Sequence, residues 1–106
     1  MAKYLIQANY VGDGVKGLLK DGGSSRSAAI EKAIKSLGGT MECLYYAFGE
    51  YDILGIFDMP DKVSIASFVL TFRATGLVTG KTTVLITPEE MDEVAKKSPT
   101  YRGPGQ

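Results

Sequence analysis

The chain has 106 residues and a mass of 11.4 kDa, which is enough for one domain and too little for two. Twelve Lys and Arg residues balance twelve Asp and Glu residues, so the chain lacks the basic excess of a nucleic-acid-binding protein. Histidine is absent, which removes the usual general base at neutral pH and the commonest metal ligand. We therefore expect no metal, no redox cofactor and no nucleic acid to bind.

Cysteine usage and hydropathy favour a cytoplasmic location. Cys43 is the only cysteine, which excludes an intrachain disulfide or a Cys-rich metal site and suits a reducing compartment. We expect it to be an inert interior thiol, because no histidine is present to activate it. The N-terminal segment becomes polar too early for a secretory signal, and no apolar run approaches the roughly 20 residues that span a bilayer. We expect a soluble cytoplasmic protein with no membrane partner.

The first part of the chain predicts a strand followed by two helical segments. Side chains alternate over residues 3–10, as in a strand with one buried face. Helical spacing over residues 15–19 predicts a short helix. An apolar stripe over residues 29–37 predicts a longer helix, whose first amide groups Ser24 and Ser25 are expected to cap.

The middle of the chain predicts a hairpin and a second long helix. Residues 40–48 and 51–59 are rich in β-branched, aromatic and apolar residues, and Gly49-Glu50 between them predicts a tight antiparallel turn. Pro60 ends the second of these strands, and Asp61 is the expected start of a helix that ends at Gly76.

The last part predicts a fourth strand and one more helix. Residues 77–87 alternate again, and Thr87 is the expected N-cap of a helix with Pro88 at its first position. We assign residues 1–98 to the domain and residues 99–106 to a Pro- and Gly-rich tail, either mobile or laid along another subunit. The resulting order is strand, helix, strand, strand, helix, strand. It predicts an α+β protein with a ferredoxin-like βαββαβ antiparallel sheet and an extra C-terminal helix.

Alternation divides the strand residues between two sheet faces. One face is expected to collect Tyr4, Ile6, Ala8, Ile53, Gly55, Phe57, Val84 and Ile86. The other face is expected to collect Leu5, Leu44, Phe48, Leu54, Ile56 and Leu85, mixed with the polar Gln7, Asn9, Tyr46, Asp52 and Lys81. Two helices cover only one face, so we predict a symmetric dimer packed sheet on sheet as an α+β barrel. A slip of one residue in the second strand would exchange its two faces.

The segment Phe48-Gly49-Glu50-Tyr51-Asp52 resembles the motif of the GYD domain family. Further similar segments occur in the same order: residues 3–8, 15–19, 22–23 with Arg26, 38–39, 81–85 and 101–105. The resemblance implies a small prokaryotic protein with a ferredoxin-like, dimeric α+β barrel fold and no settled biochemical activity.

Three groups of residues are candidate sites. Tyr51 and Asp52 are placed to orient a ligand, with Asp52 as a base if burial raises its pKa; alternatively they lock the hairpin. The polar side chains of one sheet face either line a pocket or bond across a dimer interface, and they are Gln7, Asn9, Tyr46 and Lys81. The third group either binds an anion or simply starts a helix, and it consists of Ser24, Ser25 and Arg26.

These observations favour a homo-oligomeric module that binds a small organic metabolite or serves in assembly, without metal or redox cofactor. Its expected partners are further copies of itself. The alternative is a small cofactor-independent enzyme of the dimeric α+β barrel type, monooxygenase-like or isomerase-like. In such an enzyme tyrosine and carboxylate chemistry would have to replace histidine.

Overall fold

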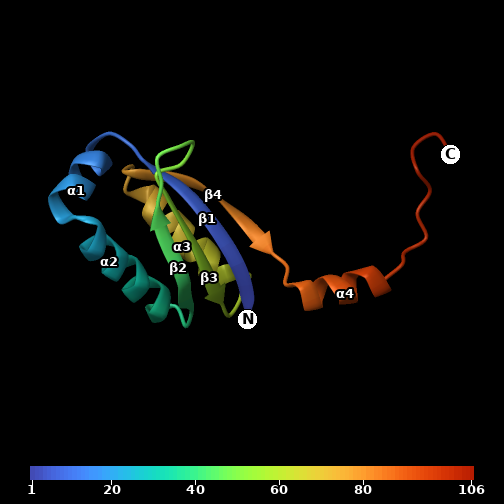
Figure 1. The fold of residues 1–106 in the computed structure, drawn as a ribbon. Coiled ribbons are helices and arrows are strands. Elements are labelled where there is room, and N and C mark those ends of the chain that lie inside the picture. The colour runs from blue at the N-terminus through green and yellow to red at the C-terminus, as the bar shows by residue number, and fades with distance from the viewer.

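The computed structural model describes residues 1–106 and contains one four-stranded sheet and four helices (Figure 1). Neighbouring strands are all antiparallel, in the order β2-β3-β1-β4. The strands are β1 (Ala2–Tyr10), β2 (Thr40–Tyr46), β3 (Ile53–Met59) and β4 (Val78–Leu85). The helices are α1 (Asp13–Asp21), α2 (Gly23–Ser36), α3 (Lys62–Ala74) and α4 (Pro88–Lys96). This confirms the predicted ferredoxin-like α+β fold.

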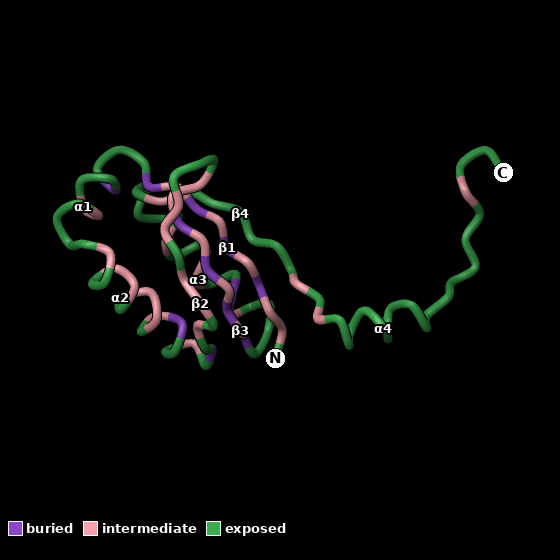
Figure 2. Tube along the Cα trace, in the orientation of Figure 1, coloured by how far each residue is buried: buried purple, intermediate pink, exposed green.

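The core lies between one sheet face and the helices α2 and α3. Burial alternates along β1 and β3, the two central strands, as the purple segments of Figure 2 show. The buried apolar residues are Tyr4, Ile6, Ala8, Tyr10, Ile34, Ile53, Phe57, Met59 and Ile65. Most of the predicted core face is thereby confirmed. Val84 and Ile86 differ, because they lie at or beyond the end of the edge strand β4 and remain more than half exposed.

A β-bulge corrects the predicted faces of β2. Met41 pairs with Phe57, but Cys43 pairs with Ile56, so one extra residue stands between them. Beyond the bulge, Leu44 and Tyr46 lie on the helix-facing side of the sheet, and their assignment to the other face is wrong. The one-residue slip is the alternative that the structure adopts.

The connection between β2 and β3 is longer than the predicted Gly49-Glu50 turn. It spans residues 47–52, so the expected ends of both strands are wrong by two residues. The backbone N–H of Asp52 donates to the carbonyl of Ala8 in β1, at 3.0 Å, and its carbonyl accepts from Ala47 at 2.8 Å. The loop is thus held by β1 as well as by its own hairpin. Phe48, expected on a sheet face, lies in this loop and is fully exposed.

Helix starts follow the predicted capping residues at two of three positions. Asp61 accepts a hydrogen bond from the Ser64 N–H at 2.7 Å, and Thr87 and Glu90 form a reciprocal capping box at α4. The expected Ser24 and Ser25 caps are wrong. Gly22 occupies the N-cap of α2 with φ 81°, a left-handed conformation, and no side chain caps the helix.

Acidification is expected to weaken the α3 cap. The hydrogen bond from Ser64 holds the pKa of Asp61 below its usual value of 3.8. Because the folded pKa is lowered, this contribution is complete above the unfolded pKa and disappears as the pH falls through the folded one. Unfolding free energies measured between about pH 5 and pH 2 should therefore fall less in Asp61→Asn, which caps without titrating. An equal fall in both proteins would show that the Asp61 carboxylate contributes nothing.

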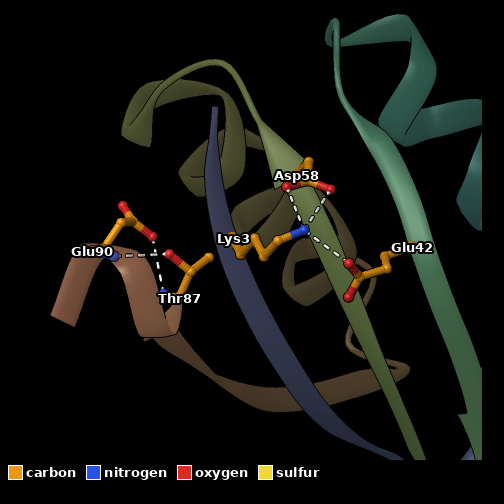
Figure 3. Close-up of polar contacts among 5 residues, drawn as sticks. All are labelled: Lys3, Glu42, Asp58, Thr87 and Glu90. Atoms are coloured by element: carbon orange, nitrogen blue, oxygen red, sulfur yellow. Dashed lines mark hydrogen bonds and ion pairs between the residues drawn. The ribbon is translucent and has the colours of Figure 1, made fainter. Parts of the chain in front are cut away.

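The sheet face away from α2 and α3, called the open face here, is uncovered in the single chain. Its central positions include the half-buried Leu5, Leu54 and Ile56. Near one end, the Lys3 Nζ donates to Glu42 Oε1 at 2.8 Å and to Asp58 Oδ1 at 3.0 Å (Figure 3). These two carboxylates raise the pKa of Lys3. The open face thus combines apolar side chains with a charged cluster whose partners are all within the chain.

Residues 86–106, called the C-terminal arm here, extend away from the rest of the molecule (Figure 1). The radius of gyration is 16.9 Å, against about 13 Å for a compact chain of this length. Met91 and Val94 of α4 and Tyr101 beyond it are exposed. The arm therefore leaves its apolar side chains without a partner in this chain. None of the four helices is both long and apolar enough to cross a membrane.

Candidate functional site

A cleft of about 250 Å³ opens between α2 and α3, above the core face of the sheet. Seventeen residues line it, and thirteen of them are hydrophobic. Its floor includes Ile6, Ala8 and Ile53. Because protein interiors are normally packed with few voids, an open apolar space of this size is a candidate binding site. We call it the helix cleft.

The two walls of the helix cleft differ in side-chain size. On α2 they consist of small or aliphatic residues, including Ala29, Ile30 and Ala33. The α3 wall is aromatic, since Phe68 and Phe72 pack edge to face with ring centroids 5.4 Å apart. Small residues on one helix leave room for a ligand against the aromatic wall of the other.

A second hollow of about 180 Å³ adjoins the cleft where α1 meets the end of α3. The two spaces share lining residues, which are Tyr10, Arg26, Phe72, Thr75 and Val78. Arg26 therefore stands at their junction, and it is the only cationic residue that lines either space. Asp21 is the only anionic one, and it lines the second hollow.

The Arg26 guanidinium forms no ion pair and no hydrogen bond within the chain. The chain's ion pairs instead connect Lys3 to Glu42 and Asp58, and Lys16 to Asp13. Arg26 is half-buried in the first turns of α2, a helix that begins without a side-chain cap. Both the guanidinium and the positive end of the helix dipole favour negative charge here.

Tyr46 links the start of α2 to the sheet. Its hydroxyl donates to the carbonyl of Gly23 at 2.9 Å. A Cβ at Gly23 would lie 3.1 Å from the Tyr46 ring, so a glycine permits this close approach. Burial raises the pKa of Tyr46, Tyr10 acts in the same direction, and Arg26 opposes them. Tyr10, Arg26 and Tyr46 therefore lie within electrostatic reach of one another at one end of the cleft.

Asn9 and Asp52 form a reciprocal set of hydrogen bonds between β1 and the loop of residues 47–52. Asp52 Oδ2 accepts from the Tyr10 N–H at 2.9 Å, and the Asp52 N–H donates to Asn9 Oδ1 at 3.0 Å. The Asn9 side chain also donates to the Glu50 carbonyl at 3.2 Å. These bonds continue the β1–β3 pairing past its last residue pair and fix the backbone of Tyr10, whose side chain lines the cleft.

Replacing Asp52 by alanine is expected to lower the free energy of unfolding by about 1–2 kcal/mol, because the half-buried Tyr10 N–H loses a charged acceptor. Asp52→Asn retains a side-chain oxygen and should cost less. Urea unfolding of the three proteins tests this order. Unchanged stability in Asp52→Ala together with lost ligand binding would instead assign Asp52 a direct contact with the ligand.

The remaining candidates lie on or beside the open face. Gln7 and Lys81 are paired on neighbouring strands, and the Lys81 Nζ lies 5.7 Å from the ring centroid of Tyr51, a cation–π distance. Ser24 and Ser25 are exposed in the first turn of α2 and do not line the cleft. Of all the sequence candidates, the structure thus brings Tyr46 and Arg26 together at the cleft.

Sequence reasoning missed the residues that form the cleft itself. Tyr10 and the α3 aromatics Phe68 and Phe72 were expected only as core. The available signal was the run of small residues at Ala28, Ala29 and Ala33, which leaves one helix wall shallow. That signal becomes informative only when the separation of α2 from α3 is known.

The chemistry of the helix cleft suits binding through apolar contact and hydrogen-bond donation. Its polar residues are Arg26, Thr71 and Thr75, and the Thr75 hydroxyl already donates to the Phe72 carbonyl at 2.7 Å. No carboxylate lines the cleft, and no group of three metal-ligating side chains gathers in the structure. Arg26 is therefore the strongest polar anchor available to a ligand.

Comparison with known proteins identifies the family of the chain. A comparison with curated proteins finds no match. A family model described as GYD domain matches residues 4–95, a range that includes every strand and all but the last residue of α4. This match confirms the resemblance carried by Phe48-Gly49-Glu50-Tyr51-Asp52. Because it covers most of the 106 residues, the chain belongs to the GYD domain family.

Proposed function

We propose that the protein is a homo-oligomeric module that binds a small, mainly apolar organic molecule in the helix cleft. The observation that carries this proposal is the cleft itself, an apolar space of about 250 Å³ between α2 and α3. Ligand sites in proteins are typically concave and apolar with a few polar groups, and this cleft has that composition.

Binding is tested by titrating the ¹⁵N-labelled protein with 4-phenylbutanol, an uncharged aromatic probe, and following the backbone amides by NMR. We expect saturable shifts at residues of α2 and α3 that line the cleft, such as Ala33 and Phe72. Ala29→Phe places a large ring in the cleft and should abolish these shifts. Ala28→Phe, at the neighbouring exposed position outside the lining, is the matched control. Shifts that survive in Ala29→Phe, or no saturable shifts in the unchanged protein, would overturn the proposal.

The homo-oligomeric part of the proposal is supported by the open face and the C-terminal arm. The open face carries Leu5, Leu54 and Ile56 in the centre of the sheet with no covering layer. The arm places Met91 and Val94 away from the body, although a nine-residue helix is only marginally stable without packing. Burying both surfaces against a second copy would stabilise them, with the two sheets packed face to face.

Light scattering coupled to size-exclusion chromatography tests this assembly. We expect the unchanged protein to have twice the chain mass of 11.4 kDa, or a multiple of that. Leu5→Glu on the open face should yield monomers, because it buries a charge between the sheets. Leu70→Glu on the exposed side of α3 is the matched control and should remain oligomeric. A monomeric unchanged protein at micromolar concentration, or an oligomeric Leu5→Glu variant, would contradict the assembly.

We also propose a cytoplasmic location, which the free Cys43 supports, since it forms no disulfide within the chain. Fractionation of the native host tests this, and recovery from the membrane or the medium would contradict it.

A further inference from the structure

The polar end of the helix cleft indicates the chemical class of its ligand. Building on the proposed function, we propose that the cleft takes a monocarboxylate with an aromatic, apolar body. The carboxylate binds the Arg26 guanidinium, and the apolar body lies between α2 and the aromatic wall of α3. This adds a specificity-determining residue to a site that is otherwise defined by its shape.

The anionic group is inferred from the position of Arg26. A guanidinium with no partner in the chain stands at the junction of the cleft and the adjoining hollow. Planar guanidinium groups bind carboxylates through two parallel hydrogen bonds, which fixes the orientation of the ligand. The uncapped start of α2, in whose first turns Arg26 lies, adds positive potential at the same end.

The apolar body is inferred from the rest of the lining. Phe57, Phe68 and Phe72 all line the cleft, and the Phe57 and Phe68 centroids are 6.0 Å apart. Rings at such spacings offer edges and faces on which an additional aromatic ring can pack. The opposite wall consists of alanine and isoleucine side chains and presents no polar group to the middle of the cleft.

A single negative charge fits better than two. Arg26 is the only cation lining either space, and Asp21 lines the adjoining hollow, where it would repel a second anionic group. A nucleotide or a dicarboxylate would therefore leave one charge without a partner in an apolar environment, which is costly. These features together favour a monoanion of the arylalkyl carboxylate type.

The test compares 4-phenylbutyrate with 4-phenylbutanol, which share the apolar body and differ in the terminal group. Calorimetry and NMR titration should show the acid binding the unchanged protein about tenfold or more tightly than the alcohol. Arg26→Gln should remove this preference and leave the affinity for the alcohol nearly unchanged. Arg73→Gln, at an exposed arginine of α3 that does not line the cleft, is the matched control and should keep the preference.

Each remaining outcome separates this inference from the proposed function. Equal binding of both probes in the unchanged protein, or a preference that survives in Arg26→Gln, would overturn the carboxylate assignment and leave the apolar cleft as a binding site. Saturable binding of neither probe would overturn both. Raising the ionic strength should weaken the acid and not the alcohol, because only the acid depends on an ion pair.

Discussion

Replacing Phe57 by alanine is expected to lower the free energy of unfolding by about 3 kcal/mol, the largest effect of any single truncation considered. Phe57 is 2 % exposed in the central strand β3, and its ring contacts Phe68 of α3. Its loss would remove a large part of the layer between the sheet and that helix. Domains of this size have total stabilities of about 5–15 kcal/mol, so the change would be a substantial fraction of the total.

Urea unfolding followed by circular dichroism measures this effect at one fixed protein concentration, because self-association would add a concentration-dependent term. Phe48→Ala is the matched control. It removes the same atoms from a fully exposed ring in the loop of residues 47–52 and should change the unfolding free energy by less than about 0.5 kcal/mol. Similar effects in the two variants would contradict the assignment of Phe57 to the core.

The second large effect is expected at Gly14, where alanine should destabilise the protein by about 2 kcal/mol. Gly14 is buried in the first turn of α1, and a Cβ there would collide with the backbone carbonyl of Leu77. That carbonyl also accepts from the Val11 N–H at 2.9 Å, so it is held in place. Either α1 or the start of β4 would have to move.

Gly17→Ala in the same helix should have the opposite sign. No atom lies within 4 Å of the Cβ position at Gly17, so the substitution adds helix propensity without a clash. It is expected to stabilise the protein by about 0.5–1 kcal/mol. Urea unfolding of both variants tests the contrast, and stabilisation by alanine at both positions would show that α1 does not approach Leu77 as closely as the structure indicates.

Local chemistry predicted much of the fold. The alternation over β1 and β3 identified the core face, because side chains of a strand point to opposite sides regardless of what covers them. Asp61 and Thr87 were identifiable as caps because their hydrogen bonds reach only three residues along the chain. The same reasoning failed at Ser24 and Ser25, where Gly22 adopts a left-handed conformation that ends α1 and begins α2.

The candidate site was much less accessible to such reasoning. Tyr46 was assigned to the open face, since nothing in the sequence of β2 marks the bulge between Met41 and Cys43. That one extra residue rotates Tyr46 toward the helices, where it reaches Gly23. Arg26 was a candidate for anion binding, but its position beside Tyr10 and an apolar cleft required the arrangement of three elements.

The sequence by itself determined the order of strands and helices, the core face of the central strands and the membership of the GYD domain family. These features depend on alternation, helical spacing and short motifs, all of which act over a few residues. Only the tertiary structure decided the register of β2, the exposed course of the C-terminal arm and the space between α2 and α3. Those features depend on how surfaces distant in the chain pack together, and side-chain shape settles that packing only when all the partners are in place.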